Sequence, residues 1–591
     1  NNIPKDIYKY VDVIATGTDV KVNWEITIKA NNTANNAYEG ETIVIPVVCG
    51  YMKYDNKSYV LDDNVSLNAF CKGDDAGTWK IPLKGGNLLE ITNSNRSKLT
   101  ELCIPAVAGV QFIDDGCLAN CTKLTNLYLG DNDHSGYNKV IDIGDRFLYN
   151  CSSLKQIDLG VFQSVLWIHD YFLHGCSGLT SIDLSPFKNL VKIGTFSGKQ
   201  TGQLGEWGFL SNCTGLTSID LSPLTNVEKI DRHFLYSCTN LTGEIDLTSL
   251  KKLNEIGNAF LSTCSKIQKV NLDGLSELTL LGEYFMDSCS SCKEVKLSNL
   301  YKLTTLRIDF LKDCTGVETL NLRNAVSLNK IVYQFSSRNF VDVDLSIDEE
   351  LLEQYTPQLK TIEGGFLSNC SKLTKVDFSN QTSIETIGDG FLFNSTNVGK
   401  KGTEGQQDGY VKLDNLSSLK SIGSNFISCD GGKQMSVTSL DLSGMTKLEQ
   451  VGDNFLRYNK SLTTLNFGTK DKGWTSFKTV GHAFLSTCTA LPSVDLSSFI
   501  SVETIGNYFM DEMKSITEVN LSAMTKLTKI GQYFLQNDTN LATLYVPNQN
   551  PITDVGSNFL SGCNNIAKIY VPWSEGSALL NADKAKSPLK D

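Results

Sequence analysis

A phenylalanine recurs through most of the chain at a nearly constant interval. It opens segments such as FLSNCTGLTSIDLSPLTNVEKIDRH, which runs from Phe209 to His233. Of the fifteen intervals, nine are 25 residues long, one is 26, and five are lengthened by insertions. A fixed period in this range indicates a solenoid, because one unit cannot bury its own apolar residues and must stack on its neighbours. The column contains Phe147, Phe172, Phe209, Phe234, Phe260, Phe285, Phe310, Phe335, Phe366, Phe391, Phe426, Phe455, Phe484, Phe509, Phe534 and Phe559.

Numbered from this phenylalanine as column 1, the repeat has the consensus F-L-x-N-C-T-x-L-T-x-I-D-L-S-x-L-x-x-L-x-x-I-G-x-x. Columns 8 to 13 predict a short strand, and columns 19 to 22 predict a second short extended piece. The pattern continues upstream to Leu99, which gives about 18 units. The sequence therefore predicts a repeat solenoid, mainly β with short turns and helical pieces.

Cysteine fills column 5 in most units. The chain has 17 cysteines, an odd number, so at least one is unpaired. Stacked column-5 sulfurs at strand spacing lie farther apart than a disulfide allows. We expect these cysteines to be reduced, buried thiols. Whether Cys49 and Cys71 form a disulfide stays an open question. The column contains Cys121, Cys151, Cys176, Cys213, Cys238, Cys264, Cys289, Cys314, Cys370, Cys488 and Cys563.

The units L-x-x-I-x-L…L-x-x-I-G-x-x-F-L-x-x-C-x-x-L resemble the BspA-like leucine-rich repeats of bacterial surface proteins. The stretch IYVPWSEGSALLNADKAKSPLK from Ile569 resembles the terminal unit of that family with its closing helix. The resemblance covers residues 99–591. Two departures are the unit of 25 rather than the commoner 23 residues and the serine that mostly replaces proline after the strand. The resemblance implies a leucine-rich repeat array and adhesion to host or neighbouring-cell macromolecules.

Three regions follow from these patterns: residues 1–95 as an N-terminal β cap or small β domain, 96–570 as the solenoid, and 571–591 as a C-terminal cap. Alternating apolar residues over 20–29 predict a strand, and 42–48 is a second candidate. The β domain is expected to cover the open edge of the first repeat. Insertions near 194–206, 344–358, 399–408, 429–436 and 468–474 are expected to form surface loops, with a helical turn or two at 347–355.

Composition excludes several functions. A net charge of −12 without a basic run argues against nucleic acid and anionic membranes as partners. No apolar run approaches the roughly 18 residues of a membrane span. Five histidines and the lack of G-x-S-x-G, H-E-x-x-H, Walker or Rossmann motifs argue against an enzyme, and we expect no cofactor.

Aspartate dominates column 12, which should be the exposed position between two buried ones. The carboxylates either bond the serines, threonines and turn donors beside them or form an acidic stripe for a basic partner or cation. The best binding hypothesis is the region 158–246. It combines a long insertion with Asp158, Asp183, Asp220, Asp246, Trp167 and Trp207.

Other aromatic residues are expected at the surface. Trp474 is an exposed candidate, and Tyr171, Tyr284, Tyr508 and Tyr533 occupy column 25 beside the buried phenylalanine. Aromatic side chains are favoured anchors at interfaces. These tyrosines can equally cover the flank of the solenoid.

Three further motifs have ordinary structural explanations. Asp131, Asp133, Ser135 and Asp142 match the spacing of a calcium loop, without the helices of an EF-hand. The motif Cys289-Ser-Ser-Cys292 fits two core columns better than a redox site. His169 and His174 flank Phe172 and are expected to be exposed, without ligand partners.

The sequence thus predicts a non-catalytic binding or adhesion protein, extracellular or displayed at the cell surface, with a protein or glycan ligand. Attachment through a lipid-anchored segment upstream of Asn1 stays open. One alternative is a glycan-capture protein, which predicts tryptophan and tyrosine clustered with aspartate. Another is a structural spacer that displays the N-terminal domain. The protein is expected to be a monomer.

Overall fold

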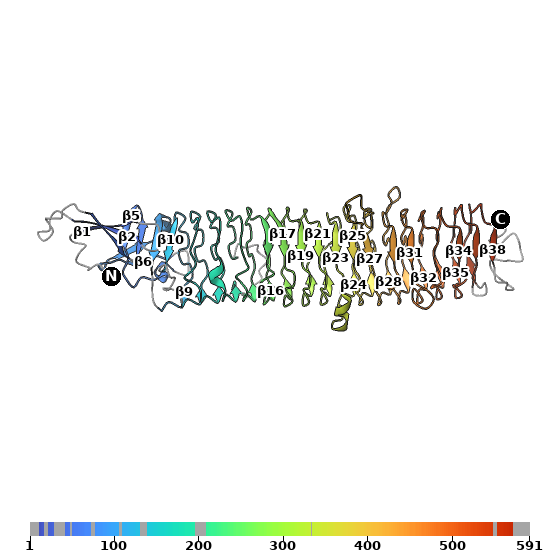
Figure 1. Cartoon of the computed structure of the whole chain (residues 1–591), viewed down its shortest axis with the longest axis horizontal. Helices are drawn as coiled ribbons and strands as arrows, with labels where there is room; N and C mark the ends of the chain where they lie inside the picture. Colours follow the sequence, from blue (N-terminus) through green and yellow to red (C-terminus); the bar gives the residue numbers. More distant parts are fainter. Residues whose placement is uncertain are drawn as a thin grey trace. The chain divides into compact units, whose positions relative to one another are not determined.

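The computed structural model describes residues 50–71, 77–105, 109–130, 139–195, 208–332, 334–547 and 552–570, and the backbone of 11–16, 22–28 and 42–47. The chain is a β-solenoid of about 18 turns with almost no helix, as the repeat predicts. It divides into two compact units: Asn1–Cys292 with Asp309–Cys314, and Lys293–Ile308 with Thr315–Asp591. Each turn of the solenoid has a first side, formed by columns 8 to 13, and a second side, formed by columns 19 to 22 (Figure 1).

The first unit begins with antiparallel strands. Strand β4 pairs antiparallel with β8, the strand of the first repeat, and β8 pairs parallel with β10 of the next turn. Strand β4 therefore occupies the edge of β8 that faces away from β10, and a capping role for residues 1–95 as a whole stays a prediction. The two predicted early strands are present as β2 and β3. The elements are β1 (Val11–Thr16), β2 (Val22–Ile28), β3 (Thr42–Val47), β4 (Tyr51–Tyr54), β5 (Lys57–Val60), β6 (Trp79–Pro82), β7 (Leu88–Ile91), β8 (Leu99–Ile104), β10 (Asn126–Leu129), and the 3₁₀ helices η3 (Leu67–Phe70) and η4 (Asn93–Lys98).

A parallel sheet of two-residue strands forms the second side of the first unit. Its order is β18-β16-β14-β13-β12-β11-β9, so every turn pairs with its neighbours. These strands are β9 (Phe112–Ile113), β11 (Asp142–Ile143), β12 (Trp167–Ile168), β13 (Lys192–Ile193), β14 (Lys229–Ile230), β16 (Glu255–Ile256) and β18 (Leu280–Leu281). The first side contains β15 (Gly243–Asp246) and β17 (Ile267–Asn271), and the 3₁₀ helix η6 (Ser185–Phe187) follows the first side of its turn.

The second unit repeats this arrangement. On its first side lie β19 (Glu294–Lys296), β21 (Thr319–Asn321), β23 (Asp342–Asp344), β25 (Lys375–Asp377), β27 (Tyr410–Lys412), β29 (Ser439–Asp441), β31 (Thr464–Asn466), β34 (Glu518–Asn520), β36 (Thr543–Tyr545) and β38 (Lys568–Tyr570). On its second side lie β20 (Thr305–Leu306), β22 (Lys330–Ile331), β24 (Thr361–Ile362), β26 (Thr386–Ile387), β28 (Ser421–Ile422), β30 (Gln450–Val451), β32 (Thr479–Val480), β33 (Thr504–Ile505), β35 (Lys529–Ile530) and β37 (Asp554–Val555).

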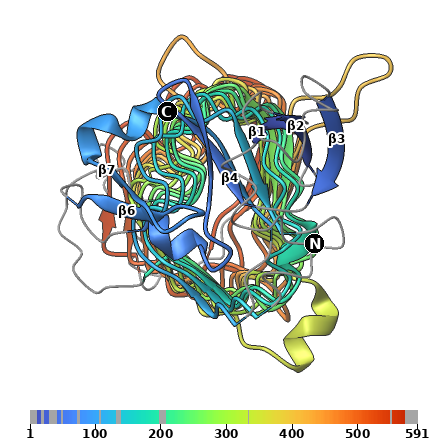
Figure 2. The ribbon, with the colours of Figure 1, turned by 90° about the vertical axis from the view of Figure 1, so that its left-hand side faces the viewer.

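The helical turn expected in 347–355 is present. It forms the 3₁₀ helix η7 (Glu349–Glu353), which stands off the turns of the second unit as a yellow-green ribbon (Figure 2).

The phenylalanine column forms a stack inside each unit. Phe234 is fully buried, and its ring centroid lies 5.3 Å from that of Phe209 and 5.6 Å from that of Phe260. The planes are nearly parallel, because one turn repeats the geometry of the last. Buried leucines and isoleucines at columns 8, 13, 19 and 22 fill the space beside this stack.

Each turn bends at residues with left-handed backbone. In one turn these are His233 (φ 58°), Leu235 (φ 55°) and Ser237 (φ 58°). A leucine in this region costs about 1–2 kcal/mol. Stacking holds it there: Leu235 donates its N–H to the Phe209 carbonyl at 2.9 Å, and its own carbonyl accepts the Cys264 thiol at 3.0 Å.

The column-5 cysteines are free thiols, as expected, and all except the half-buried Cys563 are buried. From Cys151 onward, each donates to the carbonyl of column 2 or column 1 in the preceding turn, for example Cys238 to Leu210 at 3.1 Å. Cys289 and Cys292 are both core residues, which confirms the structural interpretation of that motif. Cys49 lies outside the described residues, so its pairing with Cys71 stays a prediction.

These thiols should be inert in the folded protein. Burial raises the pKa of Cys238 to about 12 and that of Cys370 to about 11, so little reactive thiolate exists at neutral pH. We expect thiol counting with a chromogenic disulfide to detect almost no cysteine before denaturant and nearly all afterwards. Among the described cysteines, the half-buried Cys563 should react first. Finding six or more disulfides would contradict the prediction that the column-5 cysteines are free thiols.

Candidate functional site

The column-12 aspartates all make the same local hydrogen bond. Oδ1 of Asp183 accepts the N–H of Ser185 at 2.8 Å, and Oδ1 of Asp220 accepts the N–H of Ser222 at 2.9 Å. Asp158 and Asp246 do the same with Gly160 and Thr248. The carboxylate therefore closes the turn that follows the first side, which is the structural role that sequence reasoning left open.

These carboxylates nevertheless stay at the surface. Asp158, Asp183, Asp220 and Asp246 are all exposed. Asparagine serves the same turn elsewhere, since Asn520 Oδ1 accepts the N–H of Ser522 at 3.0 Å. Charge is thus not needed to hold the turn.

The structure does not bring all members of the predicted stripe together. Within the described segments 154–159, 179–184 and 216–221, no strand forms on the first side, and only Asp246 lies in one, β15. In the first unit the more regular surface is the second side, with its seven-stranded sheet. Trp207 lies outside the described residues.

Trp167 belongs to the second side, in β12, and is half-buried. Its indole N–H donates to the Gly194 carbonyl at 2.7 Å. Its ring stacks on that of His169, with the two ring centroids 4.1 Å apart. It therefore does not join the aspartate stripe.

The prediction that Trp474 is exposed is wrong. Trp474 is fully buried, and its N–H donates to the Leu442 carbonyl at 2.9 Å. The loop that contains it folds back onto the phenylalanine stack, and the ring centroids of Trp474 and Phe455 lie 5.6 Å apart. The column-25 tyrosines are half-buried or exposed, and Tyr508 stacks on Tyr533 at 4.7 Å.

The two histidines beside Phe172 differ from expectation. His174 is buried and stacks on Tyr149 at 5.0 Å. Nε2 of His169 lies 2.9 Å from Oδ1 of Asp142. Asp142 is the one member of the calcium candidate that the structure describes. Asp131, Asp133 and Ser135 lie outside the described residues, and the described ones contain no cluster of three metal ligands.

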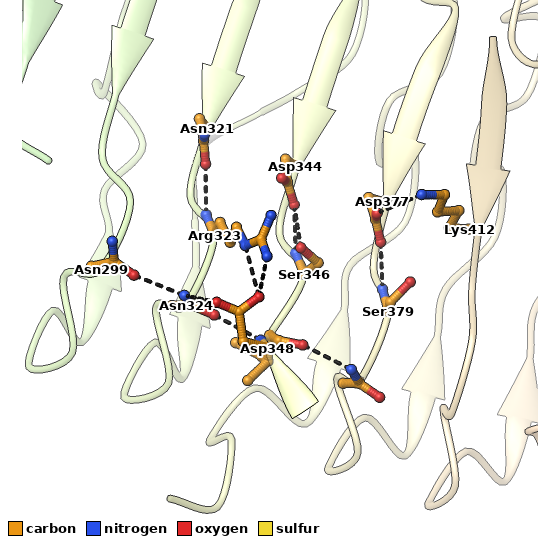
Figure 3. Close-up of polar contacts among 12 residues, drawn as sticks. Asn299, Asn321, Arg323, Asn324, Asp344, Ser346, Asp348, Asp377, Ser379 and Lys412 are labelled. Atoms are coloured by element: carbon orange, nitrogen blue, oxygen red, sulfur yellow. Dashed lines mark hydrogen bonds and ion pairs between the residues drawn. The ribbon is translucent and has the colours of Figure 1, made fainter. Parts of the chain in front are cut away.

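A polar network that the sequence did not reveal lies on the first side of the second unit (Figure 3). Nδ2 of Asn324 donates to Oδ1 of Asn299 at 2.7 Å and to Oδ2 of Asp348 at 2.8 Å. Arg323 pairs with Oδ1 of Asp348 through Nε at 2.9 Å. Burial opposes ionisation of Asp348, but the bonds from Asn324 and Arg323 hold its pKa below the ordinary value.

The asparagines of this network recur three residues after column 12 and have left-handed backbone, as at Asn299 and Asn324. That recurrence is the signal that could have predicted them. Next to them, burial raises the pKa of both Asp342 and Asp344. Nζ of Lys412 lies 3.7 Å from Oδ2 of Asp377. Their bonds to neighbouring turns give the network a structural role, and it holds no nucleophile paired with a base.

Comparison with known protein families identifies the family of this chain. The family model described as "BspA type Leucine rich repeat region (6 copies)" matches residues 93–209, 206–340, 351–401 and 449–577. No curated protein matches the sequence.

Several solved structures are similar to this chain. A leucine-rich repeat protein from Bacteroides ovatus is 15% identical over 80% of this chain and 89% of its own, with a TM-score of 0.25. The functional domain of InlJ from Listeria monocytogenes is 16% identical over 64% and 67%, with a TM-score of 0.22. A leucine rich cell surface protein from Faecalibacterium prausnitzii is 13% identical over 81% and 90%, with a TM-score of 0.16.

Proposed function

Because this chain belongs to the BspA-type leucine-rich repeat family, we propose that it binds a macromolecule through its solenoid surface without catalysing a reaction. The family consists of surface proteins that generally take part in binding and adhesion. The proposed location is the cell surface or its exterior. In the described residues, no helix has the length and apolar character needed to span a bilayer.

The observation that carries the proposal is the exposed row of column-12 carboxylates. Asn520 supports the same turn without a charge, so the aspartates add negative charge where turn formation does not require it. Repeated like charges on neighbouring turns repel one another. A basic protein partner would relieve that repulsion, which favours it over the other ligand classes.

The glycan alternative has less support. It needs tryptophan and tyrosine clustered with aspartate, whereas Trp167 is in the second-side sheet and bonded to Gly194. Trp207 lies outside the described residues and adds nothing to either proposal.

Asp183→Asn/Asp220→Asn tests the stripe. We expect binding to fall several-fold on a panel of immobilised extracellular-matrix proteins, measured by surface plasmon resonance at low ionic strength. The loss should shrink at high salt, because exposed charges are screened over about 8 Å at physiological ionic strength. Thermal unfolding should barely change, because asparagine keeps the bond to Ser185 or Ser222.

The matched control is Asp183→Ala/Asp220→Ala, which removes both the charge and the turn bond. It should bind like the asparagine variant but unfold earlier. If the asparagine variant binds the whole panel as the wild type does, the acidic stripe is not the binding surface.

A further inference from the structure

The second side of the second unit is interrupted at one place. Strands β24 to β37 form one parallel sheet, and β22 pairs with β20, but no pairing joins β22 to β24. On the first side of the same turns, the ladder continues, with Thr319 of β21 opposite Asp342 of β23. The turns are therefore stacked on one side and separated on the other.

The separation leaves two complementary strand edges. In the next turn, Glu385 donates its N–H to the Lys360 carbonyl at 2.8 Å, and Gly388 donates its N–H to the Ile362 carbonyl at 2.8 Å. The equivalent donors at the gap are the N–H groups of Lys360 and Glu363, and the equivalent acceptors are the carbonyls of Asn329 and Ile331. None of these four groups has a backbone partner among the described residues. β22 thus offers acceptors, and β24 offers donors.

Side chains at column 23 accompany the gap. This column is glycine in most turns, and a Cβ added at Gly506 or Gly531 would lie 2.7 or 2.4 Å from the backbone of the preceding turn. The turns at the gap have Val332 and Glu363 in this column instead. A side chain here does not by itself separate two turns, because Val332 still donates its N–H to the Leu306 carbonyl at 2.8 Å.

The gap is a cavity of about 550 Å³, within the range of ligand sites. The buried rings of Phe335 and Phe366 lie at its base, with centroids 4.5 Å apart. Lys330 and Lys360 are exposed at its rim, together with Glu363, which gives a net positive rim.

We propose that the gap between β22 and β24 binds an extended segment of a protein partner as an added strand, parallel to β22. Backbone bonds supply affinity in this mode, and alternate side chains supply specificity. The inserted residue that faces inward is aliphatic, as in column 22, and the residue two positions before it is acidic, opposite Lys360. This inference goes beyond the proposed function, because it holds whether or not the acidic stripe binds a partner.

A peptide with the sequence of residues 382–389 is a suitable probe, since it contains β26 with Glu385 and Ile387. We expect saturable binding of the fluorescein-labelled peptide to the full chain by fluorescence anisotropy. N-methylation at the positions of Glu385 and Gly388 removes the two backbone donors and should weaken binding about tenfold or more. Equal affinity of the methylated peptide would overturn the proposal, as would the absence of saturable binding.

Two variants of the protein complete the test. Glu363→Pro removes one unpaired donor and should weaken binding about tenfold without lowering the melting temperature. Gly388→Pro is its matched control, because there the same change breaks an existing bond and destabilises the turn. Lys360→Glu, a surface change that leaves the backbone intact, should weaken binding, and a probe with lysine at the position of Glu385 should restore it.

If folded Glu363→Pro and Lys360→Glu both bind the probe as the wild type does, the gap is not the site. Sedimentation velocity tests the other occupant: a concentration-dependent dimer that Glu363→Pro abolishes would assign the gap to a second copy of the chain and overturn the proposal.

Discussion

Replacing Asp538 by asparagine raises the free energy of unfolding of its turn by about 2–4 kcal/mol at pH 7. Asp538 occupies the cysteine column, where the side chain donates to the preceding turn, as Ser395 does to Leu367 at 2.6 Å. Asp538 is fully buried, Oδ1 accepts the N–H of Met513 at 2.7 Å, and Oδ2 has no partner. Asparagine can donate at this position without the proton that the buried carboxyl must keep at pH 7.

The pH dependence of this effect has a definite sign. Burial raises the pKa of Asp538 to about 9, with the negative charge of Asp511 adding to the shift and Lys514 opposing it. The folded state therefore keeps a proton that the unfolded state releases near pH 4. Stability is greatest below that value and falls as the pH rises towards 9. Burial likewise raises the pKa of Asp511 to about 6, so the range from pH 6.5 to 9 isolates Asp538.

Hydrogen exchange of the amides around Met513 and Leu541, corrected for intrinsic rates, measures this locally. The asparagine variant should show no loss of protection between about pH 6.5 and pH 9. Asn459→Asp is the matched reversal, because Asn459 donates to the Ile427 carbonyl at 2.6 Å in the same column. It should create the pH dependence that Asp538→Asn removes. A variant at position 538 that still loses protection as the pH rises would show that another group is responsible.

Phe234→Ala should cost about 3–5 kcal/mol, because it opens a cavity in a closely packed stack. Phe234 is fully buried, and Phe209 and Phe260 contact its two faces. Since each turn contacts only its neighbours, we expect hydrogen exchange to increase over 209–260 and to stay unchanged in β33, β35 and β37.

Tyr508→Ala provides the comparison. Tyr508 also stacks on an aromatic neighbour, Tyr533, but is 39% exposed, so its loss should cost under about 1.5 kcal/mol. A uniform loss of protection throughout the chain in Phe234→Ala would contradict a solenoid whose turns are stabilised by their neighbours.

The fold could be predicted because apolar spacing alone determines it. Phe234 and Leu235 recur with the period, and the period leaves no arrangement other than stacking. The left-handed backbone of Leu235 could not be predicted, because leucine disfavours that region in isolation and adopts it only between two neighbouring turns.

The candidate sites were harder to predict, for two reasons. An aspartate such as Asp183 can be an exposed charge for a ligand or a turn residue whose carboxylate accepts an N–H. The residue type alone does not distinguish these two roles. Trp474 lies in an insertion, where the column frame no longer indicates which side chains face inward. The gap between β22 and β24 could not be predicted from column 23. Val332 and Glu363 replace its glycine there, but His169 and Asp231 replace it in turns that pair with their neighbours.

The constant register between turns has a consequence at the level of the coding sequence. Lys529 of β35 pairs with Asp554 of β37, 25 residues later, and every regular turn repeats that offset. Recombination between two such copies deletes or duplicates a whole turn and joins matching columns, so the remaining leucines stay inside. Any other length of deletion would turn them outward. Variation in the length of the array by whole repeats is therefore compatible with folding, except across the turns of Val332 and Glu363, where an exchange would create or erase the gap.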